Sequence, residues 1–268
     1  MKYQSTVGIL AACGLFFLNL VMIPPVVCGA DTPAAPEANA KADKTGTNPL
    51  NFQNTLSLKN EFSRIGDNYA NFTRLIYSQP LRPNLKLGVE VPLLASDVSG
   101  ADEFGLSDIV IKSSWIPYAT KTMGLALGVD LTMPTATKDV LGSGKWQLAP
   151  SLTVAFFLPH NIIFAPAYKH GFSFAGEDDR ADIHTGTLDF YLVWKFDQNR
   201  QWLTLDPTFL FDYKNDRYES ATVRLNYGRV LGKVGEAVLS GFIKPGVGIG
   251  HDRPNDWSIE AGLSLIGF

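Results

Sequence analysis

The stretch DVLGSGKWQLAP, residues 139–150, is the part of the chain most suggestive of ligand chemistry. Its GSGK part resembles the end of a phosphate-binding loop, where backbone amides surround phosphates and a hydroxyl after the lysine reaches Mg²⁺. That loop needs a glycine five positions before Gly144, but Asp139 stands there, and Trp146 after the lysine has no hydroxyl. WQLAPSLTVAFF also alternates like a strand, whereas a phosphate-binding loop opens a helix. The sequence therefore favours a turn between two strands over a nucleotide site.

Hydrolase chemistry would require a nucleophile within hydrogen-bond reach of a base. His170 is followed three residues later by Ser173, but on a strand this spacing points the two side chains to opposite faces. No set of His, Asp or Glu has metal-ligand spacing, and the acidic run GEDDRAD (176–182) lacks the ligand order of an EF-hand. The sequence thus predicts no catalytic residue, no metal and no cofactor, with a lipid hydrolase kept as an alternative.

Charged side chains recur at alternate positions within apolar segments. In NLKLGVEVPL (84–93), Lys86 and Glu90 oppose a face of leucines and valines, and the segments 122–133 and 187–196 alternate in the same way. A period of two is that of a β-strand with one apolar and one polar face. If the apolar faces meet lipid, a charge among them would cost roughly 2–4 kcal/mol at mid-bilayer, so the charged faces must line an interior.

The candidates for this interior lining are Lys59, Lys86, Glu90, Asp108, Lys112, Asp130, Lys169, Asp189, Lys195, Asp206, Arg224, Lys244 and Glu260. Their mixed signs allow pairing across strands. They predict either a paired network that closes the interior or a charge-lined pathway or ligand site. Among them, Lys86, Glu90, Asp130 and Asp189 are the strongest candidates for lining a pathway.

The elements that position these residues are about twelve long strands. The predicted strands are 51–65, 69–79, 84–93, 107–116, 122–133, 146–157, 161–174, 187–196, 201–213, 219–230, 236–249 and 256–268. Globular strands usually run five or six residues, whereas a strand that crosses a bilayer needs about 9–11. The fold class is therefore all-β, a transmembrane outer-membrane antiparallel β-barrel, with a soluble exported β-sandwich as the alternative.

Short and long connections alternate along the chain. Short links at 80–83, 117–121, 158–161, 197–200 and 231–235 are separated by longer, polar ones at 95–106, 134–145, 175–184, 214–218 and 250–256. Outer-membrane barrels combine short periplasmic turns with long extracellular loops, and their aromatic residues gather near strand ends, as they do here. The link at 66–68 is short where this layout predicts a long one.

Four prolines fall inside predicted strands, at positions 150, 166, 207 and 245. Because proline cannot donate a ladder hydrogen bond, bulges or strand ends are expected there. The chain ends on Phe268, a terminal aromatic residue of the kind that barrel-assembly machinery recognises. Phe268 is at an even position, whereas the apolar residues of the last strand are at odd positions, and this difference predicts a bulge at Gly267.

The N-terminus differs from the barrel region. Residues 7–27 are almost wholly apolar and Cys28-Gly29-Ala30 offers a small-residue cleavage site, which predicts a signal peptide over 1–30. An uncleaved anchor, or a lipoprotein signal at LAAC (10–13), are the alternatives. Residues 31–48 are rich in Ala, Pro and Lys and predict a disordered lead-in. The barrel domain is then 49–268, and cleavage after Ala30 would remove both cysteines of the chain.

The net charge of −3 and the pI of about 5.8 give no electrostatic reason to expect nucleic acid as a partner. The charged fraction of 18% is below the usual quarter.

Several segments resemble the outer-membrane, transporter-like family of meta-pathway phenol-degradation (MetA-pathway) proteins. These are GVEVPL (88–93), GLSDIVIKSSW (105–115) and the hairpin LALGVDLTMPTATKDVLGSGKWQLAPSLTVAF (125–156), and the similarity extends over roughly 84–268. The resemblance implies a barrel that admits aromatic or other small hydrophobic molecules. It supplies no catalytic residues.

Together these features predict a passive channel in the bacterial cell outer membrane. Its expected partners are outer-membrane lipid, a small hydrophobic or aromatic solute, and the assembly machinery through Phe268. A lipid hydrolase or deacylase, and a structural surface barrel without an open lumen, remain as alternatives.

Overall fold

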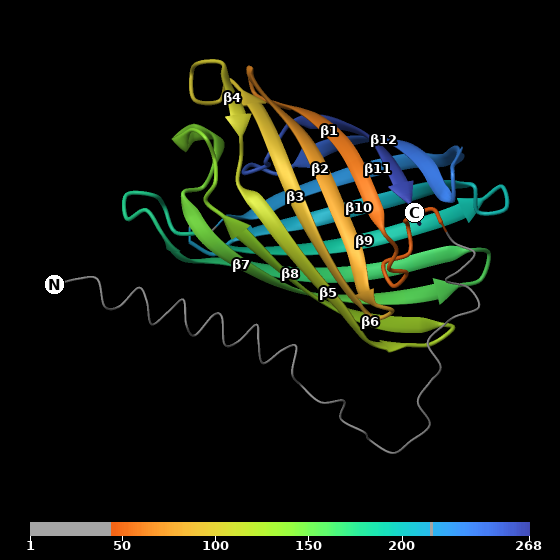
Figure 1. Ribbon diagram of the computed structural model, residues 1–268. Helices are drawn as coiled ribbons and strands as arrows, with labels where there is room; N and C mark the ends of the chain where they lie inside the picture. The colour runs from red at the N-terminus through yellow and green to blue at the C-terminus, as the bar shows by residue number, and fades with distance from the viewer. Residues whose placement is uncertain (1–43, 215–216) are drawn as a thin grey trace. The chain divides into compact units, whose positions relative to one another are not determined.

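The computed structural model describes residues 44–214 and 217–268, which form a closed antiparallel β-barrel (Figure 1). The strands are β1 (Thr55–Ile65), β2 (Asn68–Arg82), β3 (Leu85–Ser96), β4 (Glu103–Leu106), β5 (Ile109–Ala119), β6 (Met123–Met133), β7 (Lys145–Leu158), β8 (Ile162–Gly176), β9 (His184–Phe196), β10 (Gln201–Asp212), β11 (Arg217–Val234), β12 (Ala237–Ile249) and β13 (Trp257–Ile266). A 3₁₀ turn, η1 (Asp139–Leu141), precedes β7. No helix in the described ranges is long and apolar enough to cross a membrane.

Sequence neighbours pair around the barrel, and two pairings close it. β1 pairs with β13, and β2 pairs with β3. The short β4 and β5 both pair with β3 and are interrupted at Ser107 and Asp108, so together they form one barrel strand. The barrel therefore has twelve strands, as predicted.

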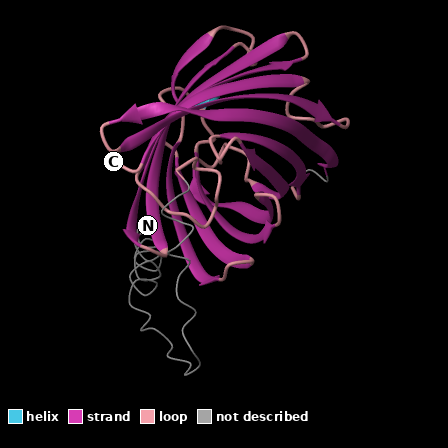
Figure 2. Ribbon diagram, turned by 90° about the vertical axis from the view of Figure 1, so that its right-hand side faces the viewer, coloured by secondary structure: helices cyan, strands magenta, loops and turns pink. Residues whose placement is uncertain are grey.

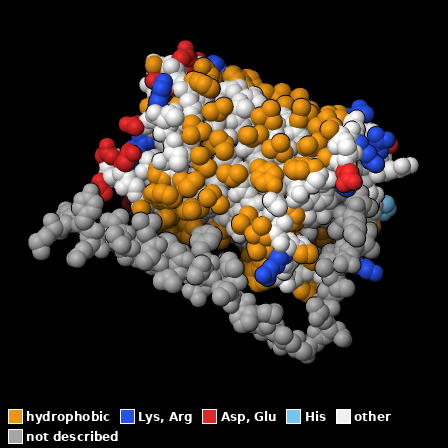
Figure 3. Space-filling view, in the orientation of Figure 1, with side chains coloured by type: hydrophobic (Ala, Val, Ile, Leu, Met, Phe, Trp, Pro, Cys, Tyr) orange, Lys and Arg blue, Asp and Glu red, His pale blue; other side chains and the backbone are white. Residues whose placement is uncertain are grey.

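The inner and outer faces alternate along each strand. In β9, Val193 is fully buried, whereas the neighbouring Leu192 and Trp194 are 38% and 50% exposed. Figure 3 shows hydrophobic side chains over the middle of the barrel wall and charged ones at its two ends. The apolar outer band and the polar interior are those of a membrane barrel. Exposed aromatic residues such as Trp115 and Trp194 near one end, and Phe104 and Trp257 near the other, match the predicted girdles.

The four strand prolines are accommodated without bulges, so the expectation of bulges or strand ends is wrong. Each one faces a partner on a single neighbouring strand: Pro150 faces Val129, Pro166 faces Phe190, Pro207 faces Val223 and Pro245 faces Ile259. On the other side, pairing skips the proline and resumes in the same register. A long membrane strand can omit a local bridge because the pairs before and after it fix the register.

Ile266 and Phe268 are two positions apart but lie on opposite faces of the wall, because the chain turns at Gly267. Ile266 is buried inside the barrel, Gly267 adopts the left-handed region with φ +74°, and Phe268 is 49% exposed near the ring of Tyr77. The turn at Gly267 thus brings the terminal ring to the outer face.

A segment that precedes the first strand folds into the barrel. Leu50 belongs to one buried cluster with Ile116, Val193 and Trp202 of β5, β9 and β10, and a side chain at Gly124 would collide with it. We call residues 44–54 the N-terminal segment. Figure 2 looks into the barrel end where loop backbone occupies the interior. Thr45 and Thr47 are buried. The predicted disordered lead-in over 31–48 is therefore wrong for residues 44–48; the rest of it, and the predicted signal peptide over 1–30, lie outside the described residues.

Candidate functional site: the barrel lumen

The lumen holds a cluster of five charged side chains from five strands. Arg74 on β2 donates to Glu61 on β1 at 3.0 Å and lies 3.3 Å from Glu260 on β13. Glu260 also pairs with Lys244 at 3.2 Å, and Glu61 with Arg224 at 3.5 Å. The central cluster, Glu61, Arg74, Arg224, Lys244 and Glu260, thus connects two carboxylates to three cations. Its carboxylates are each shared, which spreads the attraction across the seam where β1 meets β13.

Of these five, sequence reasoning missed Glu61 and Arg74. Glu61 has the same parity as Lys59 on a single strand, so that alternation could have identified it. Arg74 shares its face with Phe72 and Ile76, which obscured the polar side of β2. A register between β1 and β2 was needed to place Arg74 beside Glu61.

Four of the predicted lining residues form two further pairs across the wall. Lys112 lies 2.7 Å from Glu90, and Lys169 lies 2.6 Å from Asp130. Asp189 accepts a hydrogen bond of 2.6 Å from the Thr208 hydroxyl. These contacts join neighbouring or next-neighbouring strands.

The remaining candidates have different environments. Lys195 is buried at the inner face of β9, and Asp206 faces the lumen within electrostatic range of Lys244 and Arg224. Lys86 lies with its ammonium 4.7 Å from the centre of the Phe52 ring.

Asp108, one of the predicted lining residues, bonds to a loop rather than to a charge of another strand. It is 8% exposed and sits at the break between β4 and β5. Its carboxylate accepts hydrogen bonds from the backbone N–H groups of Ala136 and Ser143, at 3.3 and 2.7 Å, and from the Ser143 hydroxyl at 2.7 Å. Asp108 therefore holds the loop that contains GSGK against the barrel.

The GSGK stretch is a loop-to-strand turn rather than a phosphate site. Gly144 has φ +66°, which favours glycine, but Gly142 is extended, and a side chain there would collide with Ala136 and Asp108. The Arg180 guanidinium donates to the carbonyls of Asp139 and Gly142. The carbonyl groups of the turn thus face a cation of the protein itself.

Lys145 is buried at the start of β7 rather than solvated. Its ammonium lies 3.3 Å from Asp182 in the loop between β8 and β9, and Lys214 approaches the same carboxylate at 3.5 Å. The hydrogen bond and charge of Lys145, aided by the charge of Lys214, lower the pKa of Asp182 below its usual range. Ion pairs therefore connect the start of β7 with the loops that contain Asp182 and Lys214 at this end of the barrel.

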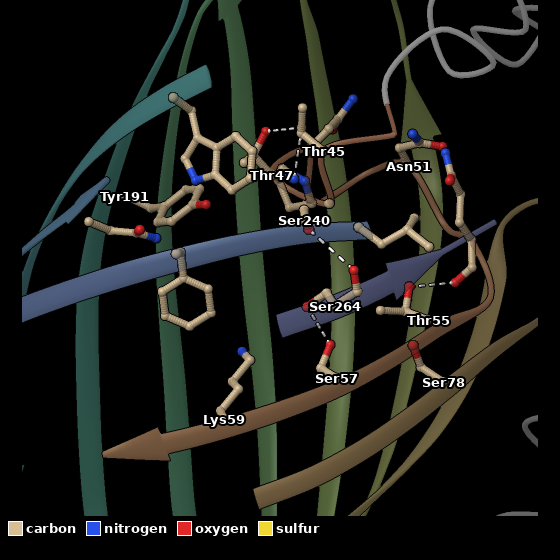
Figure 4. Close-up of a pocket in the computed structure, with 18 of the residues that line it drawn as sticks. Thr45, Thr47, Asn51, Thr55, Ser57, Lys59, Ser78, Tyr191, Ser240 and Ser264 are labelled. Atoms are coloured by element: carbon tan, nitrogen blue, oxygen red, sulfur yellow. Dashed lines mark hydrogen bonds between the residues drawn. The ribbon is translucent and has the colours of Figure 1, made fainter. Parts of the chain in front are cut away.

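A cavity of about 340 Å³ lies between the N-terminal segment and the central cluster (Figure 4). Lys244 and Glu260 of the central cluster form part of its wall, and Thr45 and Thr47 of the N-terminal segment another part. Hydroxyl groups of Ser57 and Ser264, which share a hydrogen bond of 2.7 Å, face it from β1 and β13. The lumen is thus narrowed, with a polar cavity inside.

His170 and Ser173 do not form a catalytic pair. The Ser173 hydroxyl interacts with the backbone of Ile183, whereas His170 lies 3.0 Å from His184 through their Nε2 atoms and 3.1 Å from the Tyr168 hydroxyl. No group of three or more His, Cys, Asp or Glu side chains within residues 44–214 and 217–268 is arranged to hold a metal ion.

Comparison with known proteins shows the fold. No family model matches the chain, and no curated protein matches it. Among solved structures, the COG4313 outer membrane channel from Pseudomonas putida F1 is similar, with a TM-score of 0.60, 12% identity, and coverage of 84% of this chain and 99% of that one. The NanC porin gives 0.57 at 8% identity, covering 80% and 99%. The KdgM porin, solved in complex with disordered oligogalacturonate, gives 0.53 at 11% identity, covering 79% and 98%. The chain therefore has the fold of outer-membrane porin and channel barrels.

Proposed function

We propose that this chain forms a passive channel for small solutes in a bacterial outer membrane. The observation that carries the proposal is a closed barrel whose outer band is apolar and whose interior is lined by charged and hydroxyl side chains around a cavity. Charged and hydroxyl side chains that line a barrel interior hold water there and guide polar solutes. The similar solved structures are named as porins and a channel, which supports the same role.

The size of the barrel limits the solutes. Twelve strands give a barrel wider than the side-chain-filled eight-stranded type and narrower than a sixteen-stranded porin. The N-terminal segment and the central cluster narrow it further, so passage is restricted to small molecules. The family resemblance of the sequence suggests aromatic or hydrophobic solutes; that part stays a prediction, as does recognition of Phe268 by assembly machinery.

The alternatives have less support. A lipid hydrolase would need a nucleophile beside its base, and His170 and Ser173 bond to other groups. A sealed structural barrel would have the same fold, so a measurement of solute flux distinguishes it from a channel.

Solute flux tests the proposal. We expect liposomes that contain the full-length, folded protein to take up a small sugar such as arabinose faster than protein-free liposomes. Folding is checked by a gel mobility that shifts on boiling. Liposomes that stay sealed to arabinose while the protein is folded would contradict the channel and favour the sealed barrel.

The charge-lined wall gives a second measurement. Glu90→Ala and Asp130→Ala each leave a lumen lysine without its carboxylate, so each should change single-channel conductance. A matched substitution on an exposed turn, Asp197→Ala, should leave conductance unchanged.

A further inference from the structure

Two lysines in the cavity are not matched by carboxylates. The ion pairs among the described residues include neither Lys59 nor Lys86. Both line the cavity, from β1 and β3. The nearby Glu260 is already shared by Lys244 and Arg74. The cavity therefore has an excess of positive charge that the protein does not neutralise with direct contacts.

The two ammonium groups are instead held by aromatic rings. Lys59 lies 5.6 Å from the centre of the Phe242 ring, and Lys86 lies 4.7 Å from that of Phe52. A cation–π contact positions an ammonium group but leaves its other donors available. Figure 4 shows Lys59 extending into the cavity beneath Tyr191.

The rest of the wall is rich in hydroxyl groups, several of which bond to one another or to backbone carbonyls. The hydroxyl-bearing side chains that line it are Thr45, Thr47, Thr55, Ser57, Ser78, Tyr191, Ser240 and Ser264. Several of them are labelled in Figure 4. A volume of about 340 Å³ is within the range of small-molecule sites, which run from roughly 300 to 1,000 Å³.

An ammonium group removed from bulk water without an anion is costly, and an anionic ligand removes that cost. We propose that the cavity is a binding site for a small organic anion, which is attracted by the positive charge of Lys59 and Lys86 and hydrogen-bonded by hydroxyl groups of the wall. The inference rests on the proposed channel, because the site lies within the lumen, and it names the class of solute that the channel retains.

Binding is tested directly, without transport. The probe is 4-fluorobenzoate, followed by ¹⁹F NMR line broadening on the full-length folded protein in detergent, and its neutral counterpart is 4-fluorobenzamide. We expect the acid to bind at least ten times more tightly than the amide. Lys59→Met and Lys86→Met should each weaken binding of the acid about tenfold, whereas Lys121→Met, at an exposed turn outside the cavity, should not change it.

Equal affinity for acid and amide, absence of binding to the wild-type protein, or acid binding that survives both methionine substitutions would overturn the site. If either variant does not fold, competition on the wild type replaces it: acetate should displace 4-fluorobenzoate and acetamide should not, and the reverse would overturn the proposal. Acid binding without arabinose flux would sustain the site and contradict only the channel.

Discussion

Five lysines of the lumen fall into two groups with opposite surroundings. Lys112, Lys169 and Lys244 each lie 2.6 to 3.2 Å from a carboxylate on another strand. Lys59 and Lys86 stand instead over phenyl rings beside the cavity. The first group joins strands into a closed wall, whereas the second leaves positive charge directed at space that a solute can enter. A charged lumen therefore contains both structural and ligand-directed residues, and the partner of each lysine distinguishes the two.

The largest loss of stability is expected from a substitution of Glu260, which pairs with Lys244 of the first group. Glu260→Gln removes the charge shared by Lys244 and Arg74 at a side chain that is 5% exposed. Breaking a buried pair leaves uncompensated charge, so we expect the free energy of unfolding to fall by about 3 kcal/mol. Equilibrium urea unfolding of the folded protein in detergent measures it.

The control is an exposed pair. Glu103→Gln removes the partner of Lys138, and both side chains are partly solvated, at 26% and 49%. Its effect should stay within about 0.5 kcal/mol. Equal losses in the two variants would show that the central cluster adds no more than a surface pair.

A smaller effect is expected at Asp108, which binds a loop rather than a lysine. Asp108→Ala leaves the N–H groups of Ala136 and Ser143 without their acceptor, which should cost about 2 kcal/mol. The loop 134–144 should also be cleaved faster by an added protease. Asp139→Ala changes an exposed carboxylate in the same loop and should do neither. Unchanged cleavage of Asp108→Ala would show that other contacts hold the loop.

The sequence predicts which strand residues face inward, but it does not predict the contacts that they make inside the barrel. Strict alternation in β3, β6 and β9 fixes which side chains point inward, because a single misplaced charge would face lipid. Alternation on one strand does not give the register between strands. The partner of Arg74, and the shared use of Glu260, depend on that register and could not be predicted.

The N-terminal segment was missed for a related reason. Its Ala-, Pro- and Lys-rich neighbourhood has no apolar period, so composition alone indicates disorder. Leu50 nevertheless packs against inner residues of strands more than sixty positions later. Burial by distant elements leaves no local pattern. Asp108 is similar, since its loop partners lie about thirty positions away.

The smallest effect concerns the loop pair of Lys145 and Asp182. Since the pKa of Asp182 is lowered, the contact should be fully present above the ordinary carboxyl pKa of about 4 and be lost as the pH falls through the lowered native value. We expect amide hydrogen exchange in 177–183 to be faster in Asp182→Asn than in wild type at pH 6, with the difference gone at strongly acidic pH. The exposed Asp178→Asn should match wild type at both. A difference that persists in strong acid would contradict the ion pair.

The zero-current potential across a planar bilayer under a KCl gradient tests the contrast between the two groups of lysines most directly. The unmatched positive charge of Lys59 and Lys86 predicts that the wild-type channel prefers chloride, and that the double variant Lys59→Met, Lys86→Met moves the potential toward potassium preference. The same potential in both proteins, or potassium preference in the wild type, would contradict the account.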